Sequence, residues 1–136
     1  VLASAPDRLA LRPLFNTWAN FYGVQPSLVE AVAWQESGWQ EGVVSSVGAV
    51  GIGQLMPATV QLVESLVGIN LNVTSAYDNI RMTSRYLAWL ASQENNSPCR
   101  TIAAYYEGPT NLADSGVLTV TVPYLADVEA LIPRFQ

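Results

Sequence analysis

Residues 36–59 read ESGWQEGVVSSVGAVGIGQLMPAT, and this stretch is the most informative part of the 136-residue chain. Glu36 ends a run of helical periodicity, and four glycines then follow at positions 42, 48, 51 and 53 among small apolar residues. Glycine adopts backbone conformations that other residues avoid, so residues 39–53 are predicted to be irregular. A carboxylate therefore lies at the junction between a predicted helix and a glycine-rich irregular segment.

Glu36 extends the apolar face of its predicted helix. It lies four residues after Val32, seven after Val29 and eight after Leu28, which is helical spacing. A carboxyl group on an inward face loses hydration, which raises its pKa and suits it to act as a general acid. The alternatives are that the last helical turn rotates Glu36 into solvent, or that an arginine pairs with it.

The rest of the chain is also predominantly helical in pattern. Proline opens and glycine closes several of the predicted helices, as expected at helix ends. Residues 117–122 (VLTVTV) have strand propensity but no evident partner strand, so we expect an extended connection there. We predict about six helices: residues 11–21 before Gly23, 26–37 before Gly38, 57–67 before Gly68, one after the capping box Ser75-x-x-Asp78, 98–107, and one from Pro123.

The composition excludes many kinds of catalytic site. The chain has no His, one Cys, and six basic residues that are all Arg. Without His and Lys there is no Ser-His-Asp triad, His-ligated zinc site, Schiff base or phosphate-loop lysine. Eleven carboxylates, six tyrosines and Cys99 remain for proton chemistry.

The charge and hydropathy patterns argue against nucleic acid and membranes as partners. The net charge of −5 argues against a nucleic-acid binder and against docking on anionic lipid. No apolar run approaches the roughly 18 residues of a membrane span. The start, Val1 to Asp7, lacks the basic and long apolar regions of a signal peptide. We expect a monomer.

The stretch beginning at Glu36 resembles the soluble lytic transglycosylase domain, within the goose-type lysozyme-like family. That family's pattern is Glu-Ser, then Ser-x-x-Gly-Ala-x-Gly, then Gln-x-Met-Pro-x-Thr, and Glu36, Ser45 and Gln54 open its three parts here. The resemblance covers residues 24–132. Later segments match in the same order: Asn79-Ile80 with Tyr86-Leu87, residues 104–109 (AYYEGP), and Pro123-Tyr124-Leu125 with Val128.

The resemblance implies a mostly α, lysozyme-like single domain over residues 1–136, with the glycine-rich segment lining a cleft. It implies an enzyme, a lytic transglycosylase, that cleaves the β-1,4 bond between N-acetylmuramic acid and N-acetylglucosamine in peptidoglycan. Glu36 would be the acid and then the base, assisted by the substrate's acetamido group, and 1,6-anhydro ends would form. No cofactor or metal is implied, and the substrate implies an extracytoplasmic location. The implied substrate-binding residues are Ser45, Gln54, Met56, Tyr105 and Tyr124.

Two residues depart from the family pattern. Tyr106 stands where the family usually has Asn, and Glu107 where it has Ala. Glu107 either faces the cleft, as a further substrate-binding or acidic residue, or is solvated or bound to backbone at its helix end. The functional alternatives are therefore a lysozyme-type hydrolase on the same glycan, with a second carboxylate placing water, and a glycan-binding module without turnover. Taken alone, Met56 is more typical of core packing, whereas Tyr105 and Tyr124 suit core packing and a functional role equally.

Overall fold

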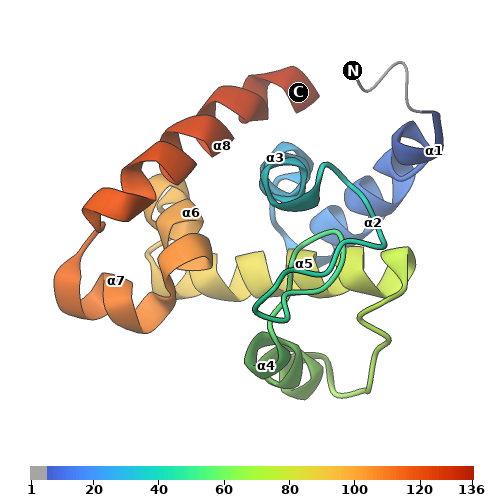
Figure 1. Cartoon of the computed structure of the whole chain (residues 1–136), viewed down its shortest axis with the longest axis horizontal. Coiled ribbons are helices and arrows are strands. Elements are labelled where there is room, and N and C mark those ends of the chain that lie inside the picture. The colour runs from blue at the N-terminus through green and yellow to red at the C-terminus, as the bar shows by residue number, and fades with distance from the viewer. Residues whose placement is uncertain (1–5) are drawn as a thin grey trace.

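The structure is a computed structural model that describes residues 6–136, and it is mostly helical, with long loops over residues 39–56 and 68–75 (Figure 1). The expected mostly α fold is confirmed. Val1 to Ala5, part of the stretch on which the signal-peptide expectation rests, lie outside the described residues. The elements are α1 (Pro6–Leu9), α2 (Arg12–Tyr22), α3 (Pro26–Ser37), α4 (Pro57–Val67), α5 (Ala76–Gln93), α6 (Pro98–Glu107), α7 (Pro109–Ser115), the 3-10 turn η2 (Thr119–Thr121) and α8 (Val122–Phe135).

The helix ends follow the expected chemistry. The helices α2, α3 and α4 end at Gly23, Gly38 and Gly68, which adopt left-handed conformations with φ of 75°, 62° and 88°. These angles favour glycine because it has no Cβ. The Ser75 hydroxyl accepts a hydrogen bond from the Asp78 amide at 3.4 Å, which caps α5. The glycine and capping signals therefore placed these helix ends correctly.

Two features near the C-terminus differ from expectation. A short helix, α7, follows Gly108 directly and buries Leu112. The predicted extended connection over residues 117–122 was wrong for residues 119–122, because η2 covers Thr119–Thr121 and α8 begins at Val122. Pro123 in the first turn favours a helix start, and this outweighs the strand propensity of the β-branched residues.

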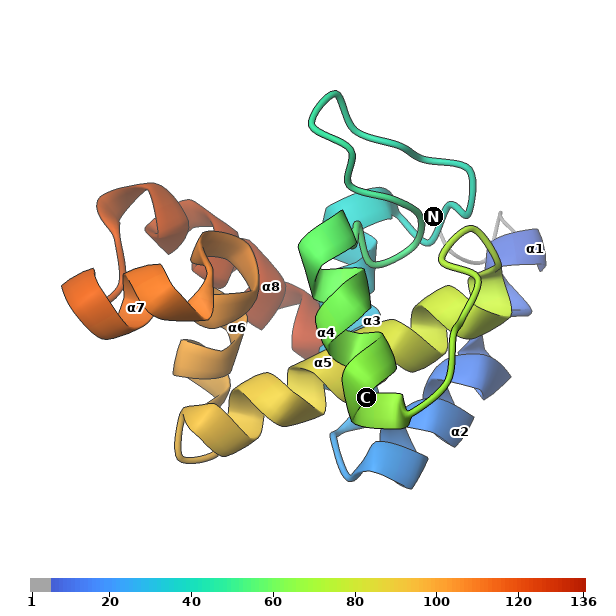
Figure 2. The same cartoon turned by 90° about the horizontal axis from the view of Figure 1, so that it is seen from below.

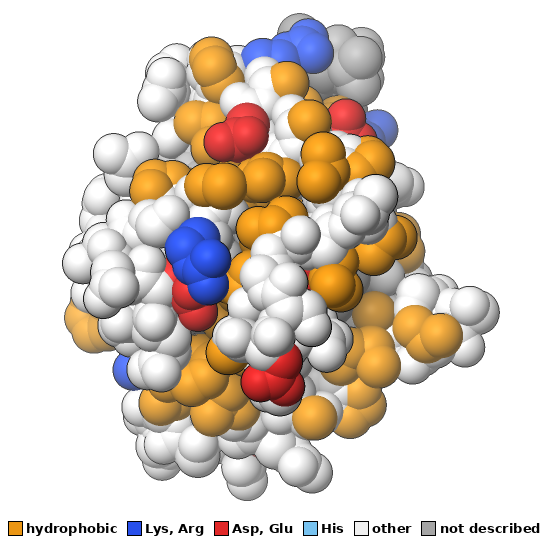
Figure 3. Space-filling view, turned by 90° about the vertical axis from the view of Figure 1, so that its left-hand side faces the viewer, with side chains coloured by type: hydrophobic (Ala, Val, Ile, Leu, Met, Phe, Trp, Pro, Cys, Tyr) orange, Lys and Arg blue, Asp and Glu red, His pale blue; other side chains and the backbone are white. Residues whose placement is uncertain are grey.

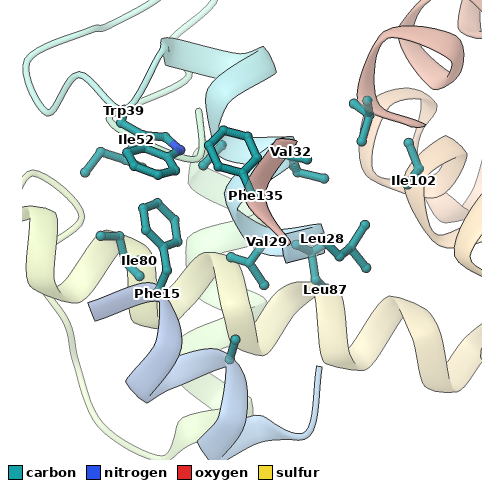
Figure 4. Packing of buried hydrophobic residues seen from close by; sticks show 14 of the residues in the cluster. Phe15, Leu28, Val29, Val32, Trp39, Ile52, Ile80, Leu87, Ile102 and Phe135 are labelled. Atoms are coloured by element: carbon teal, nitrogen blue, oxygen red, sulfur yellow. The ribbon is translucent and has the colours of Figure 1, made fainter. Parts of the chain in front are cut away.

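Two apolar clusters lie against the long helix α5, which crosses the centre of Figure 1. One cluster joins α2, α3 and α8, and in it the Trp39 ring lies 4.7 Å from Phe15 and 5.1 Å from Phe135 (Figure 4). The other cluster lies among α4, α5, α6 and α7 and includes Val63, Met82 and Leu112. α3 is therefore held by packing along its length, which fixes the position of its C-terminal turn.

The glycine segment, residues 39–53, leaves α3 as a loop that projects from the helical body (Figure 2). Isolated antiparallel bridges join Val50 to Val44 and to Leu55. The buried Asn79 side chain accepts from the Gly53 amide at 2.8 Å and donates to the carbonyls of Val50 and Val73 at 3.0 and 2.9 Å. One asparagine on α5 thus anchors the base of the loop.

The surface over α7 and α8 is mostly apolar or uncharged (Figure 3). Val120 and Val122 are 63% and 52% exposed, and charged residues make up only 12% of the chain. In the part that the structure describes, no helix combines the length and the apolar character that crossing a membrane requires.

Candidate active site

Glu36 lies in the last turn of α3, where the chain is forced to turn away. Gly38 and Trp39 both have positive φ, 62° and 61°. The Trp39 conformation is unusual for a bulky residue, and burial together with a 2.9 Å hydrogen bond from its indole N–H to the Glu30 carbonyl holds it in place. The Ser37 hydroxyl donates to the Ile52 carbonyl at 2.7 Å. The end of α3 is therefore fixed on both sides of the Glu36 side chain.

The Glu36 carboxyl is partly buried and is bound by one phenol. Burial raises its pKa from 4.5 to about 7, and the hydrogen bond from the Tyr124 hydroxyl to Oε2, at 2.6 Å, acts in the opposite direction. Within residues 6–136 no arginine lies within ion-pair distance of Glu36. A carboxyl group with a pKa near 7 can both donate and accept a proton at neutral pH.

Tyr105 connects the glycine segment to this carboxyl. Its hydroxyl donates to the Gly53 carbonyl at 2.6 Å. Burial, and then the negative charge of Glu36, raise its pKa well above 10, so Tyr105 stays a neutral donor. A Cβ on Gly53 would collide with the Thr83 hydroxyl and lie 3.0 Å from the Tyr105 hydroxyl. The absence of a side chain at Gly53 is what allows α5, α6 and the loop to meet.

Gln54 follows the glycine segment in a left-handed conformation, with φ of 51°. Its side-chain nitrogen, Nε2, donates to the backbone carbonyls of Val43 and Gly51 at 3.0 and 2.9 Å. No hydrogen bond from residues 6–136 reaches its carbonyl oxygen, so this oxygen is the atom that can accept from a ligand.

Ser45 lies further out on the projecting loop. Its hydroxyl oxygen accepts from the amides of Ala49 at 3.0 Å and Val47 at 3.3 Å. The hydroxyl proton remains available to donate, since both contacts use the oxygen as acceptor. Ser45 is not among the residues that line the pocket described next.

A pocket of about 230 Å³ collects most of the other predicted site residues. Gln54, Met56, Tyr105 and Glu107 line it, and Met56 is 39% exposed there. Tyr106 lines the same pocket and stacks on Tyr124 with 4.5 Å between ring centroids. Tyr106 therefore connects the pocket with the Tyr124–Glu36 pair.

The two carboxylate oxygens of Glu107 have different environments. Oε1 accepts from the Leu118 amide at 3.0 Å. Oε2 is buried and has no hydrogen-bond partner among the described residues. The Oε1 contact agrees with the alternative in which Glu107 is bound to backbone at its helix end. Glu107 nevertheless also lines the pocket.

The family model for the transglycosylase SLT domain matches residues 13–119. The chain belongs to the transglycosylase SLT domain family. It is 34% identical over 103 residues to a transglycosylase of Enterobacteria phage PRD1, covering 75% of this chain and 36% of the relative. It is 31% identical over 106 residues to the soluble lytic murein transglycosylase of Escherichia coli (strain K12), covering 74% of this chain but only 16% of that protein.

Solved structures of SLT proteins have the same fold. The lytic transglycosylase Slt of Pseudomonas aeruginosa, solved as an inactive glutamate-to-glutamine mutant, superimposes with a TM-score of 0.86 at 25% identity, covering 93% of this chain and 24% of that one. The complex of the 70-kDa soluble lytic transglycosylase with bulgecin A gives a TM-score of 0.84 at 26% identity, covering 91% of this chain and 24% of that one. The expected lysozyme-like fold of this family is therefore confirmed, although the chain spans only a minor part of these proteins.

The SLT site contains residues that the sequence did not single out as functional. Asn79 anchors the loop, and Thr59 and Tyr86 line the pocket. All three belong to segments that match the family pattern, so that pattern was the available signal. No pattern in the sequence predicts that Tyr106 stacks on Tyr124, because the two residues lie on different helices.

Proposed function

We propose that this SLT chain cleaves the β-1,4 bond between N-acetylmuramic acid and N-acetylglucosamine in peptidoglycan as a lytic transglycosylase. The observation that carries the proposal is the Glu36 carboxyl, partly buried, bound by Tyr124 and with its pKa raised to about 7. The names of the relatives support the same reaction class. The chain would act as one catalytic domain, as a monomer, and outside the cytoplasm where this glycan lies.

The reaction begins with protonated Glu36. Glu36 gives its proton to the glycosidic oxygen as the C1–O bond breaks, while the acetamido oxygen of the muramic unit bonds to C1, so no protein nucleophile is needed. The ionised Glu36 then takes the proton of the C6 hydroxyl, whose oxygen displaces the acetamido oxygen at C1. The product carries a 1,6-anhydro ring, and Glu36 is protonated again.

The surrounding residues would bind and orient the glycan. The Gln54 carbonyl oxygen and the Ser45 hydroxyl proton supply one acceptor and one donor for sugar hydroxyl and acetamido groups. Met56 offers an exposed apolar contact. Tyr105 and Tyr124 fix the loop and the acid, which keeps the reacting groups aligned.

Mass spectrometry of soluble products from purified peptidoglycan tests this proposal. We expect anhydro-muropeptides from the wild type and a loss of about 10²–10⁴-fold in rate for Glu36→Gln. Glu129→Gln, an exposed carboxylate on α8, is the matched control and should behave like the wild type. Reducing-end products would instead indicate the hydrolase, and binding without any cleavage would indicate the glycan-binding module.

A further inference from the structure

One carboxylate oxygen of Glu107, Oε2, receives no hydrogen bond from the described residues. Its Oε1 is committed to the Leu118 amide, while Oε2 is buried and unpartnered in the described part of the chain. The ion pairs among residues 6–136 involve Glu30 and Glu94, so no arginine neutralises Glu107. A carboxylate oxygen that is removed from water and left unbound is costly, which points to a donor that arrives with a ligand.

The pocket around Glu107 is suited to such a donor. Gln54 lines this pocket, and its side-chain oxygen, another acceptor, receives no hydrogen bond from residues 6–136. Met56 and Tyr106 add apolar surface. At about 230 Å³ the pocket has room for a single small unit. Two acceptors and no cation would bind hydroxyl or amide N–H groups and would repel a carboxylate.

We infer that Glu107 determines which sugar unit enters this pocket. Oε2 accepts a hydrogen bond from a hydroxyl or amide N–H of an uncharged N-acetylated sugar, and the negative charge disfavours a unit that presents a carboxylate at the same place. The inference rests on the proposed function, because it takes the pocket to be part of the glycan cleft. The fixed Oε1 contact separates this role from that of a second catalytic acid.

The decisive variant is Glu107→Gln, made in the Glu36→Gln protein so that binding is measured without turnover. The glutamine carbonyl can still accept from the Leu118 amide, while an NH2 group replaces Oε2 and turns the acceptor into a donor. The probes are an N-acetylglucosamine tetramer and the same tetramer oxidised to carboxylates at C6, each titrated by calorimetry. Asp114→Asn, an exposed carboxylate on α7, controls for net charge.

We expect Glu107→Gln to weaken binding of the uncharged tetramer about tenfold and to reduce discrimination against the oxidised tetramer by at least as much. The variant should still unfold cooperatively. Asp114→Asn should change neither affinity. If Glu107→Gln leaves both affinities unchanged, Glu107 only holds Leu118 and the inference is wrong.

Absence of tetramer binding by the parent Glu36→Gln protein would also overturn the inference. The product analysis of the wild type reports separately on the proposed reaction, so the two failures are distinguishable.

Discussion

At the scale of single residues, the site depends on two opposing influences on one carboxyl group. Burial favours the protonated form of Glu36, whereas the Tyr124 hydrogen bond favours the ionised form. The resulting pKa of about 7 lies where a group that must first give and later take a proton works best. Changing either influence should move the pH dependence in a known direction.

Tyr124→Phe should raise the pKa of Glu36 above about 7, because it removes the hydrogen bond that stabilises the carboxylate. The acid must be protonated to start the reaction, so the alkaline limb of kcat/KM should move up by about 0.5–1 pH unit, while the maximal rate falls as the carboxyl loses its fixed orientation. Rate profiles on peptidoglycan between pH 5 and 9 measure this. Tyr77→Phe, which alters a ring packed on Trp18, should leave the profile unchanged; an unmoved limb in Tyr124→Phe would contradict the assignment.

Glu36→Gln should stabilise the fold at alkaline pH. The pKa of Glu36 is higher in the folded chain, about 7, than its ordinary 4.5, so the folded state binds more protons between these values and wild-type stability falls as pH rises through them. The variant should gain about 1–3 kcal/mol above pH 7 and almost nothing below pH 4.5. Urea unfolding at pH 4 and pH 8 measures the difference, with Glu129→Gln as the control; an equal effect at both pH values would rule out the raised pKa.

The sequence indicated some of this site and not the rest. Helical spacing placed Glu36 on an inward face, and the family motif supplied Gln54 and Tyr105. Tyr124 appeared in the motif too, but its contact with Glu36 spans 88 residues, and local pattern carries no information about such a pairing. The split environment of Glu107 depends on where the Leu118 amide lies, which is a tertiary feature.

At the scale of elements, the glycine segment and α5 form one unit. Gly53 lies against Thr83 and Tyr105, and Asn79 binds the Gly53 amide. The segment is therefore rigid at its base, where Gln54 begins, and projects only at its outer turn.

Gly53→Ala should destabilise the protein by about 1–3 kcal/mol, because its Cβ has no space. Backbone movement that makes room for the new Cβ should also displace the Gly53 carbonyl that Tyr105 binds, so activity should fall as well. Gly42→Ala is the matched control, since a Cβ there meets nothing within 4 Å. Thermal unfolding and rate measurements on both variants test this; equal Tm values would show that the contact is relaxed at no cost.

The prediction of elements succeeded where a single residue dominates the local outcome. Glycines 23, 38 and 68 ended helices, and Ser75 capped one, as expected. It failed over residues 119–122, where an extended connection was expected and the chain is helical instead. The start of α8 there was decided by Pro123 and by packing on α3.

At the scale of the whole molecule, an ion pair between a buried carboxylate and a partly exposed arginine links distant parts of the chain. Glu30 on α3 is 1% exposed and accepts from the Arg12 guanidinium at 2.8 Å. Arg12 also donates to the Phe135 carbonyl at 2.7 Å. One side chain of α2 therefore holds both α3 and the end of α8, a link that no local pattern of residues indicated.

Arg12→Met should destabilise the fold by about 2–4 kcal/mol at pH 7, because it leaves a buried carboxylate without its partner. Burial already raises the pKa of Glu30 and Arg12 lowers it, so loss of Arg12 raises it further and the destabilisation should shrink as pH falls toward 4.5. The double variant Arg12→Met/Glu30→Met should recover part of the loss. Urea unfolding of the wild type, Arg12→Met, Glu30→Met and the double variant measures this. A double variant whose loss of stability equals the sum of the two single losses would contradict the pairing.

The contacts of α8 also bear on the order in which the molecule folds. Arg12 and Phe135 are 123 residues apart, and Tyr124 and Glu36 are 88 apart, so each contact closes a large loop of chain and loses the entropy of that loop. Contacts of this kind form slowly compared with those inside helix pairs. The acid and its phenol therefore meet only when the last helix docks, and a partly folded chain holds Glu36 in water with an ordinary carboxyl's acidity. During refolding, the capacity to cleave glycan would return with the closing step rather than with the helices.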